Sequence, residues 1–313
     1  MNNKEYRPTL SQLRTFVTIA ENKHFGTAAT KLSISQPSLS QALVALEHGL
    51  GVQLIERSTR RVIVTPAGEE LLPFAKATLD AADAFLARSR GANGTLIGPL
   101  TIGIIPTIAP YILAGLLTAL NEQYPDLEPR IVEDQTRHLV QMLRDGQIDV
   151  ALMALPSEAS GVIDLPLYRE DFVVVVPAGH EFAGRDDLGL DCLQDLDLLL
   201  LDDGHCLHDQ IVDLCRSADI NPTEATNAVT RASSLTTIMQ LVAGGLGSTL
   251  VPLSAVSTET TRPGLAVSRF GDSVTAQREI GLVFRSSSSR NEEFGILGEL
   301  ITAAYQAAVA DQT

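Results

Sequence analysis

The chain has 313 residues, a length that suits two or three compact units better than a single one. Hydrophobic residues make up 45% of it, which excludes an intrinsically disordered chain, and no apolar stretch is long enough to cross a membrane. The net charge is −15, which at first argues against a partner made of nucleic acid.

The charge is distributed unevenly, however. Residues 1–65 hold eight basic and four acidic residues, net +4, whereas residues 91–313 hold twelve arginines and thirty acidic residues, net −18. A basic head on an acidic body is typical of a protein that binds DNA through the head. The polar N-terminus is no signal peptide, and the cysteines number three, so we expect a soluble cytoplasmic protein and no disulfide scaffold.

Near the N-terminus the pattern predicts a helix-turn-helix. Apolar residues mark one face of a helix over 10–20, and a second short helix covers 25–32. After a turn at 33–34, Ser35 is a good N-cap for a third helix, with Pro37 in its first turn. Two short helices joined by a tight turn, the second one polar at its start, are typical of this DNA-binding unit.

The third helix and the segment after it carry side chains that suit DNA. Glutamine side chains in the third helix can form hydrogen bonds with adenine. After this helix, two short strands over 54–57 and 61–65 enclose a basic turn, which is typical of a wing whose arginines contact phosphate. The alternative is a helical hairpin with an ordinary solvated surface. The predicted DNA-contacting residues are Ser35, Gln36, Pro37, Ser38, Gln41, Arg57, Arg60 and Arg61.

A long helix is predicted from Pro66 to about Arg88. Apolar residues in it alternate at steps of three and four, which is heptad spacing and favours pairing with a second helix. We therefore expect a dimerisation stalk, followed by a flexible hinge over 91–94. The expected seam consists of Leu72, Ala75, Leu79, Ala82 and Leu86.

From residue 98 onward strands and helices alternate, which predicts a parallel α/β body. We expect strands at 100–105, 129–134, 149–154, 172–177, 197–201, 225–229, 248–251, 264–269 and 279–284, and helices at 107–123, 136–145 and 291–309. The body is expected to split into two lobes with a cleft between them. The predicted domains are a winged helix-turn-helix (1–65), a linker helix (66–90) and a two-lobed α/β regulatory domain (91–313), with lobe I over about 98–170 and 271–313 and lobe II over about 171–270.

The segment GHCLHDQIVDLC (204–215) places one cysteine at the start of a helix and a second within it. A thiol at a helix N-terminus beside the imidazole of His205 can have a lowered pKa, although nearby aspartates oppose this. Nine residues of helix separate Cys206 from Cys215 by roughly 13 Å, whereas a disulfide needs Cα atoms within about 7 Å. Oxidation would therefore unwind the helix, which would make a switch. The spacing is equally compatible with two buried structural cysteines, and it matches no ordinary zinc site built from His205, Cys206, His208 and Cys215.

Residues 16–72, FVTIAENKHFGTAATKLSISQPSLSQALVALEHGLGVQLIERSTRRVIVTPAGEELL, resemble the head of a LysR-type transcriptional regulator, and the resemblance extends over the whole chain. It implies a winged helix-turn-helix, a linker helix and a regulatory domain like a periplasmic binding protein. The implied partners are operator DNA and further copies of the chain, as a homodimer or a homotetramer built as a dimer of dimers. RNA polymerase is a further partner to consider, and no cofactor, metal or membrane is expected.

Two segments, GHCLHDQIVDLC and IPTIAPYIL (105–113), resemble those of peroxide-sensing members of this family. The resemblance implies that Cys206 reacts with hydrogen peroxide and that Cys215 resolves the product to a disulfide. It also implies a peroxide pocket made of Thr107, Thr136, His205 and Arg278. Taken locally, each threonine could be a simple N-cap and the arginine a surface salt bridge, and Cys192, which has no place in a two-cysteine scheme, is expected to be a buried bystander.

Three hypotheses follow. The first is a peroxide-responsive transcription factor that is not an enzyme. The second is a regulator whose effector is a small organic molecule between the lobes, held at its carboxylate by Thr107, Thr136 and Ser233-Ser234. The third is a thiol peroxidase, which would have no need of the DNA-binding head.

Overall fold

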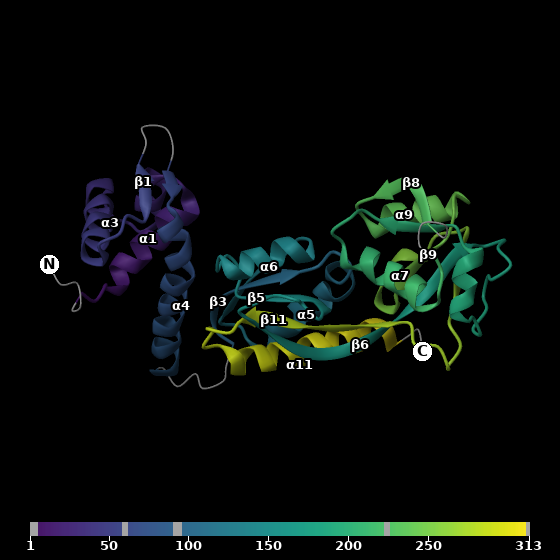
Figure 1. The fold of residues 1–313 in the computed structure, drawn as a ribbon. Coiled ribbons are helices and arrows are strands. Elements are labelled where there is room, and N and C mark those ends of the chain that lie inside the picture. The colour runs from purple at the N-terminus through teal and green to yellow at the C-terminus, as the bar shows by residue number, and fades with distance from the viewer. Residues whose placement is uncertain (1–5, 58–61, 90–95, 222–225, 311–313) are drawn as a thin grey trace. The chain divides into compact units, whose positions relative to one another are not determined.

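The computed structural model describes residues 6–57, 62–89, 96–221 and 226–310. The chain divides into two compact units, of which the first is formed mainly by residues 1–93 and the second by most of the remainder. Figure 1 shows the helical head with its long helix and the body with its sheets. No helix among the described residues is long and apolar enough to cross a membrane.

The head contains the predicted helices, α1 (Leu10–Asn22), α2 (Phe25–Lys31) and α3 (Gln36–Leu50). Ser35 is the N-cap of α3, and its Oγ accepts a hydrogen bond from the backbone N–H of Ser38 at 3.2 Å, as the sequence predicts. Residues from α1 and α3 form the core of the head, among them Phe16, Ile19, Leu39, Leu43 and Leu46. The polar start of α3 therefore stays outside while its apolar face is buried.

A two-stranded wing follows, in which β1 (Ile55–Arg57) pairs antiparallel with β2 (Val62–Val64). Arg60 and Arg61 lie outside the described residues, and of Arg57 the structure describes only the backbone at the end of β1. The long helix α4 (Pro66–Ser89) comes next, and Thr65 begins it by accepting a hydrogen bond from the Gly68 N–H at 3.0 Å.

The predicted seam of α4 needs a correction. Ala75 and Leu79 are buried in the core of the head, where α4 packs against α1. Among the described side chains of α4, the large apolar ones that are exposed are Phe74, Phe85 and Leu86, at 66%, 73% and 49% of their full accessible surface. The sequence predicts that these residues pack against a helix of a second chain. They pack instead against α1 of the same chain, which produces the same spacing of apolar residues.

In the body, β3 (Gly98–Ile104) pairs in parallel with β4 (Leu127–Glu133) on one side and with β5 (Val150–Leu155) on the other. The helices α5 (Ala109–Gln123) and α6 (Thr136–Arg144) connect these strands, as the alternating pattern predicts. The remaining helix beside this sheet is α11 (Asn291–Val309), whose buried face includes Phe294, Leu297 and Ile301.

Two long antiparallel strands carry the chain from one lobe to the other. β11 (Gln277–Arg285) pairs with β5 and with the first part of β6 (Val162–Pro177), whereas the last part of β6 pairs with β9 (Thr249–Pro252) and β10 (Leu265–Ser268). The sequence predicts only residues 172–177 of β6. Its first part is less apolar and contains Pro166, which the strand accommodates beside a shift of register at Gly281.

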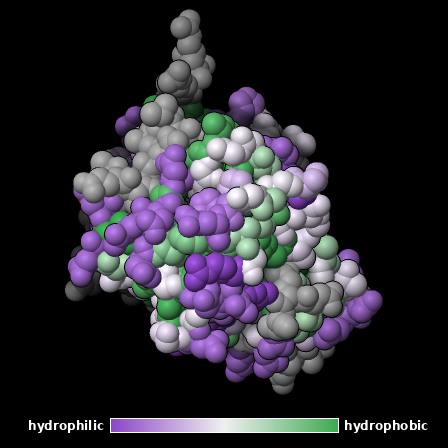
Figure 2. Space-filling model, turned by 90° about the vertical axis from the view of Figure 1, so that its right-hand side faces the viewer, coloured by the Kyte–Doolittle hydropathy of each residue, from purple (hydrophilic) through white to green (hydrophobic). Residues whose placement is uncertain are grey.

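The second lobe adds a parallel pair, β7 (Leu198–Leu201) with β8 (Thr226–Ala232). Its helices are α7 (Cys206–Ser217), α9 (Leu235–Ala243) and α10 (Val256–Glu259), with short 3₁₀ turns η2 (Leu190–Asp195) and η3 (Leu253–Ala255). Their apolar faces share one core with β6 and β9. On the face drawn in Figure 2, hydrophilic residues cover much of the surface and hydrophobic ones lie between them in smaller groups.

Candidate functional site

Cys206 is the first residue of α7, as the sequence predicts, and it is half-buried. The preceding turn depends on Gly204, which has a φ of +97°, in the region that favours glycine. A Cβ at this position would come within 2.7 Å of the side-chain oxygen of Gln135. The turn that presents the thiol is therefore pressed against the start of α6.

The guanidinium group of Arg278 lies beside this thiol and is held by Thr107. Its Nη1 donates to Thr107 Oγ1 at 2.9 Å and its Nη2 to the Thr107 carbonyl at 3.0 Å. Thr107 is buried and lies ahead of α5, whose N-cap is Ile108. The interpretation of Thr107 as a simple N-cap is therefore wrong, because its hydroxyl is an acceptor for Arg278.

Arg278 is also paired with a carboxylate. Its Nη2 and Nε lie 2.7 and 2.8 Å from Oε2 of Glu170, and only 1% of each side chain is accessible. The other carboxylate oxygen accepts a hydrogen bond from the backbone N–H of Ser254 at 3.0 Å. The alternative of a surface salt bridge for Arg278 is thus wrong, since this ion pair is fully buried.

Several buried acceptors near the thiol lack partners. Thr136 is the first residue of α6, and apart from its interaction with the Cys206 thiol its Oγ1 has no hydrogen-bond partner. The side-chain oxygens of Gln135 and Gln210 are likewise buried and unpaired. Gln210 is four residues after Cys206 and therefore lies on the same face of α7. Such acceptors suit a small ligand that donates hydrogen bonds.

Burial dominates the electrostatics of the thiol. It raises the pKa of Cys206 above its ordinary value, while the charge of Arg278 and the hydroxyls of Thr136 and Thr107 lower it in part. The sequence left the direction of this pKa open, and in the structure the effect of burial is the largest. His205 cannot supply the charge, because burial lowers the pKa of its imidazole and favours the neutral ring.

The other two cysteines are less accessible. Cys215 is buried on the inner face of α7, nine residues after Cys206, and burial raises the pKa of its thiol. Cys192 lies in η2, where burial and two neighbouring aspartates raise its pKa to about 11. All three cysteines are free thiols.

The structure therefore brings Cys206, Thr107, Thr136 and Arg278 together, and His205 caps α7 next to them without a side-chain hydrogen bond to the helix. The sequence analysis missed Glu170, Gln135 and Gln210. The spacing of four residues after Cys206 was a signal for Gln210, whereas nothing local marks Gln135 or Glu170. No group of three or more metal-binding side chains occurs among the described residues.

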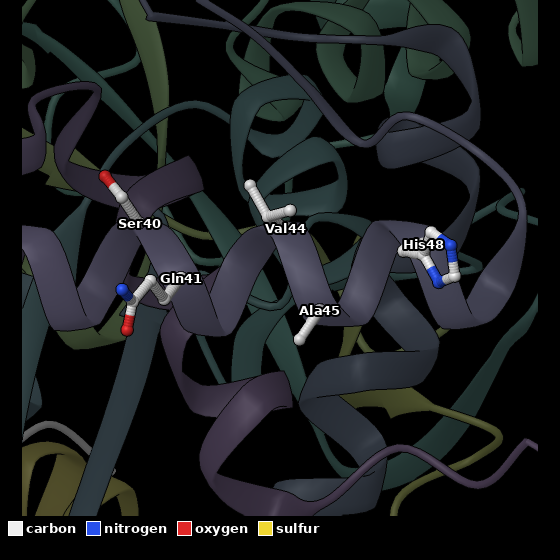
Figure 3. Close-up of a pocket in the computed structure, with 5 residues that line it drawn as sticks. All are labelled: Ser40, Gln41, Val44, Ala45 and His48. Carbon is white, nitrogen blue, oxygen red and sulfur yellow. The ribbon is translucent and has the colours of Figure 1, made fainter.

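A second candidate site is the outer face of α3. Ser35, Gln36, Pro37, Ser38 and Gln41 are all exposed, as expected for residues that contact DNA. Figure 3 shows the continuation of this face along the helix, where a surface hollow is lined by Ser40, Gln41, Val44, Ala45 and His48. Val44 is 51% exposed and could meet a thymine methyl group, a contact that the sequence analysis did not include.

A helix-turn-helix head with a two-lobed α/β body defines a signal-responsive DNA-binding regulator, and comparison with known proteins agrees. Residues 10–69 match the model of the bacterial regulatory helix-turn-helix protein, lysR family, and residues 93–305 match the LysR substrate binding domain. The chain belongs to the LysR family of transcriptional regulators.

Its relatives include a probable hydrogen peroxide-inducible genes activator of Mycobacterium avium, 49% identical and covering 98% of both chains. The DNA-binding transcriptional dual regulator OxyR of Escherichia coli K12 is 36% identical over 94% of this chain and 95% of its own. Among solved structures, the H2O2-bound C206S mutant of Corynebacterium glutamicum OxyR is 73% identical, with a TM-score of 0.71, covering 98% of this chain and 95% of that one. The oxidized form of the same protein is 71% identical, with a TM-score of 0.63 and coverage of 98% and 96%.

Proposed function

We propose that this LysR-family regulator senses hydrogen peroxide through Cys206 and Cys215 and changes its binding to operator DNA in response. The observation that carries the proposal is the setting of Cys206. Its thiol lies at the start of a helix, beside the buried cation Arg278, the Thr136 hydroxyl and the unpaired buried acceptor Gln210 Oε1. Hydrogen peroxide has two O–H donors and two oxygen acceptors, so it can bond to hydroxyl and amide oxygens while it accepts from a thiol or a cation.

The chemistry balances without a cofactor. The Cys206 thiolate attacks one peroxide oxygen, an S–O bond forms and the O–O bond breaks, and the departing hydroxide takes up a proton and leaves as water. Sulfur loses two electrons and becomes a sulfenic acid. The Cys215 thiol then attacks that sulfur, an S–S bond forms, and the hydroxyl group leaves as a second water. Arg278 favours the anionic species along this path.

The second step requires a change of fold. Both cysteines belong to the continuous helix α7, in which nine residues of rise separate their Cα atoms by roughly 13 Å. A disulfide needs about 7 Å or less, so α7 must unwind for the bond to close. The unwinding removes the buried Leu207 and Ile211 from their places in the lobe core, which couples a local oxidation to the packing of the body.

The relatives support this assignment. Several are named as hydrogen peroxide-inducible genes activators, and solved OxyR structures include H2O2-bound and oxidized forms.

The Ser234 hydroxyl, which the organic-effector hypothesis invokes, caps α9 by accepting a hydrogen bond from the Thr237 N–H at 3.3 Å.

The same proposal covers the partners. The outer face of α3 enters the major groove of operator DNA, and the exposed Phe74 and Phe85 of α4 contact a second copy of the chain. The chains assemble as a dimer of dimers. This tetramer contacts RNA polymerase and acts in the cytoplasm, where the DNA is.

Genome-wide DNA capture with the full-length protein tests the function. Reduced protein and protein treated with equimolar hydrogen peroxide are each incubated with sheared genomic DNA, and the bound fragments are sequenced. We expect specific fragments whose occupancy changes with peroxide in the wild type and does not change in Cys206→Ser. If the occupancy of every fragment stays the same when the wild type is treated with peroxide, the proposal is wrong.

A further inference from the structure

Glu170 lies at the point where β6 and β11 run side by side, directly opposite Arg278 in the register of the two strands. Its carboxylate oxygens are both used, one by the guanidinium group and the other by the Ser254 N–H. A buried carboxylate with two fixed partners has little freedom to move. Glu170 therefore fixes the position of the cation that faces the thiol.

We propose that Glu170 is a positioning residue of the redox site, whose carboxylate holds Arg278 against Thr107 and offsets the charge that Arg278 presents to Cys206. The role of Glu170 in a redox site rests on the proposed function. Its effect on the Cys206 thiol can be measured without peroxide. A bare arginine at this depth would stabilise a thiolate, because a nearby opposite charge favours the ionised form. With the carboxylate 2.7 Å away, much of that field is cancelled.

The field of Glu170 extends to other groups. It contributes to raising the pKa of Tyr111, Tyr168 and Tyr305, although burial is the larger cause at each. Glu170 reaches the Cys206 thiol through Arg278, because it pairs with the guanidinium group whose charge lowers the pKa of that thiol.

The charged and titratable groups around the thiol come from every element packed there. They are His208 and Asp209 on α7, Arg278 on β11, Glu170 on β6, Arg137 on α6 beside Gly204, and Asp202 and His205 ahead of α7. Asp209 raises the pKa of the thiol and Arg278 lowers it. Of these groups only Glu170 is in direct contact with Arg278, so its removal changes the net charge of the buried pair without touching the thiol.

The test is the rate at which iodoacetamide alkylates Cys206 as a function of pH, in peroxide-free full-length protein, followed by mass spectrometry of the Cys206 peptide. Glu170→Gln keeps the shape and removes the charge, and we expect the midpoint of the profile to fall by at least about one pH unit. Glu170→Asp retains the charge and should restore a midpoint close to that of the wild type. A midpoint unchanged or raised in a folded Glu170→Gln protein would overturn the proposal.

The chain offers a matched control one position along the same two strands. Glu279 is opposite Arg169 in the register and lies 3.5 Å from it, but this pair is exposed to solvent. Glu279→Gln removes one carboxylate from the same strand pair and should leave the midpoint where it is. An equal shift in both variants would show a general effect of net charge and would contradict the specific role of Glu170.

A second comparison keeps the test usable if the unpaired Arg278 prevents Glu170→Gln from folding. Arg278→Gln alone leaves the carboxylate uncompensated and should raise the midpoint, whereas the double variant Arg278→Gln with Glu170→Gln should lower it again. Opposite shifts identify charge as the cause, and equal midpoints for the two variants would overturn the proposal. Because alkylation needs no peroxide, these outcomes stand even if the protein fails to react with hydrogen peroxide.

Discussion

Arg278 donates to Thr107 twice, to the side-chain Oγ1 at 2.9 Å and to the backbone carbonyl at 3.0 Å. The two residues are 171 positions apart in the chain and lie on β11 and just ahead of α5. This double contact aims the guanidinium group at the start of α7. It also makes the hydroxyl of Thr107 separately testable, because the carbonyl bond survives when the hydroxyl is removed.

Thr107→Val should slow the reaction of Cys206 with peroxide by about tenfold or more, because Arg278 loses an acceptor and the thiol loses a hydroxyl that favours its ionised form. DNA binding by the reduced protein should not change. Stopped-flow measurement of thiol oxidation gives the rate. The matched control is Thr118→Val on the exposed side of α5, where the hydroxyl bonds only to Ala114. Equal rates for Thr107→Val and the wild type would leave Thr107 without a role in the reaction.

Cys192 should react slowly at neutral pH, because burial and its acidic neighbours raise its pKa to about 11. An unfolded cysteine ionises near pH 8.5. The folded thiol thus stays protonated while the unfolded one loses its proton, so the free energy of unfolding should fall as pH rises from about 8.5 toward 11. Urea denaturation between pH 7 and 11 measures this slope. Cys192→Ala should flatten it, and an identical slope in that variant would assign the effect to other groups.

Gln36→Ala should weaken binding to a cognate operator by roughly 1–3 kcal/mol and binding to random DNA much less, if this exposed first residue of α3 reads a base. Fluorescence anisotropy with both DNAs, at two salt concentrations, separates base-specific binding from the salt-dependent binding to phosphate. Gln123→Ala, an exposed glutamine at the end of α5, is the control. A loss of equal size on both DNAs would make Gln36 a contact to the phosphate backbone.

Phe85→Glu should dissociate the oligomer without unfolding the head, because Phe85 is 73% exposed on α4. Leu79→Ala should instead destabilise the head without dissociating the oligomer. It removes a buried side chain from the α1–α4 core, at a cost of about 2–5 kcal/mol in the free energy of unfolding, and should leave the association of folded chains intact. Sedimentation velocity and thermal melts distinguish the two. An unchanged oligomer in Phe85→Glu would place the dimer contact on another surface.

The sequence predicted the local features of the fold well. Helical periodicity and the Ser35 cap located α1 to α3, and the cysteine at the start of α7 was placed correctly, because these depend on neighbours within a few residues. The seam of α4 was misassigned, since a period of three and four residues does not say which helix the face packs against.

The site was predicted less completely, for a physical reason. Glu170 and Arg278 meet only through the register of two strands, 108 positions apart, and no local pattern encodes that pairing. Thr107 was assigned to the pocket only through the resemblance, and its position after a strand was equally compatible with a helix cap, because nothing local shows that a distant arginine donates to its hydroxyl. The direction of the Cys206 pKa was likewise beyond the sequence, because it depends on how deeply the thiol is buried.

In the proposed mechanism peroxide joins Cys206 to Cys215, and α7 must unwind for this to happen. The most direct measurement is peptide mapping of the thiols after substoichiometric peroxide, combined with hydrogen exchange over residues 206–217 of the same samples. We predict that the wild type loses two thiols for each peroxide consumed, with a Cys206–Cys215 disulfide and reduced protection of α7 in the oxidised chains, whereas Cys206→Ser loses none. In Cys215→Ser, one thiol should be lost as a sulfenic acid or a higher oxide. A disulfide that includes Cys192, or a Cys206–Cys215 disulfide in a segment that stays fully protected, would contradict the account.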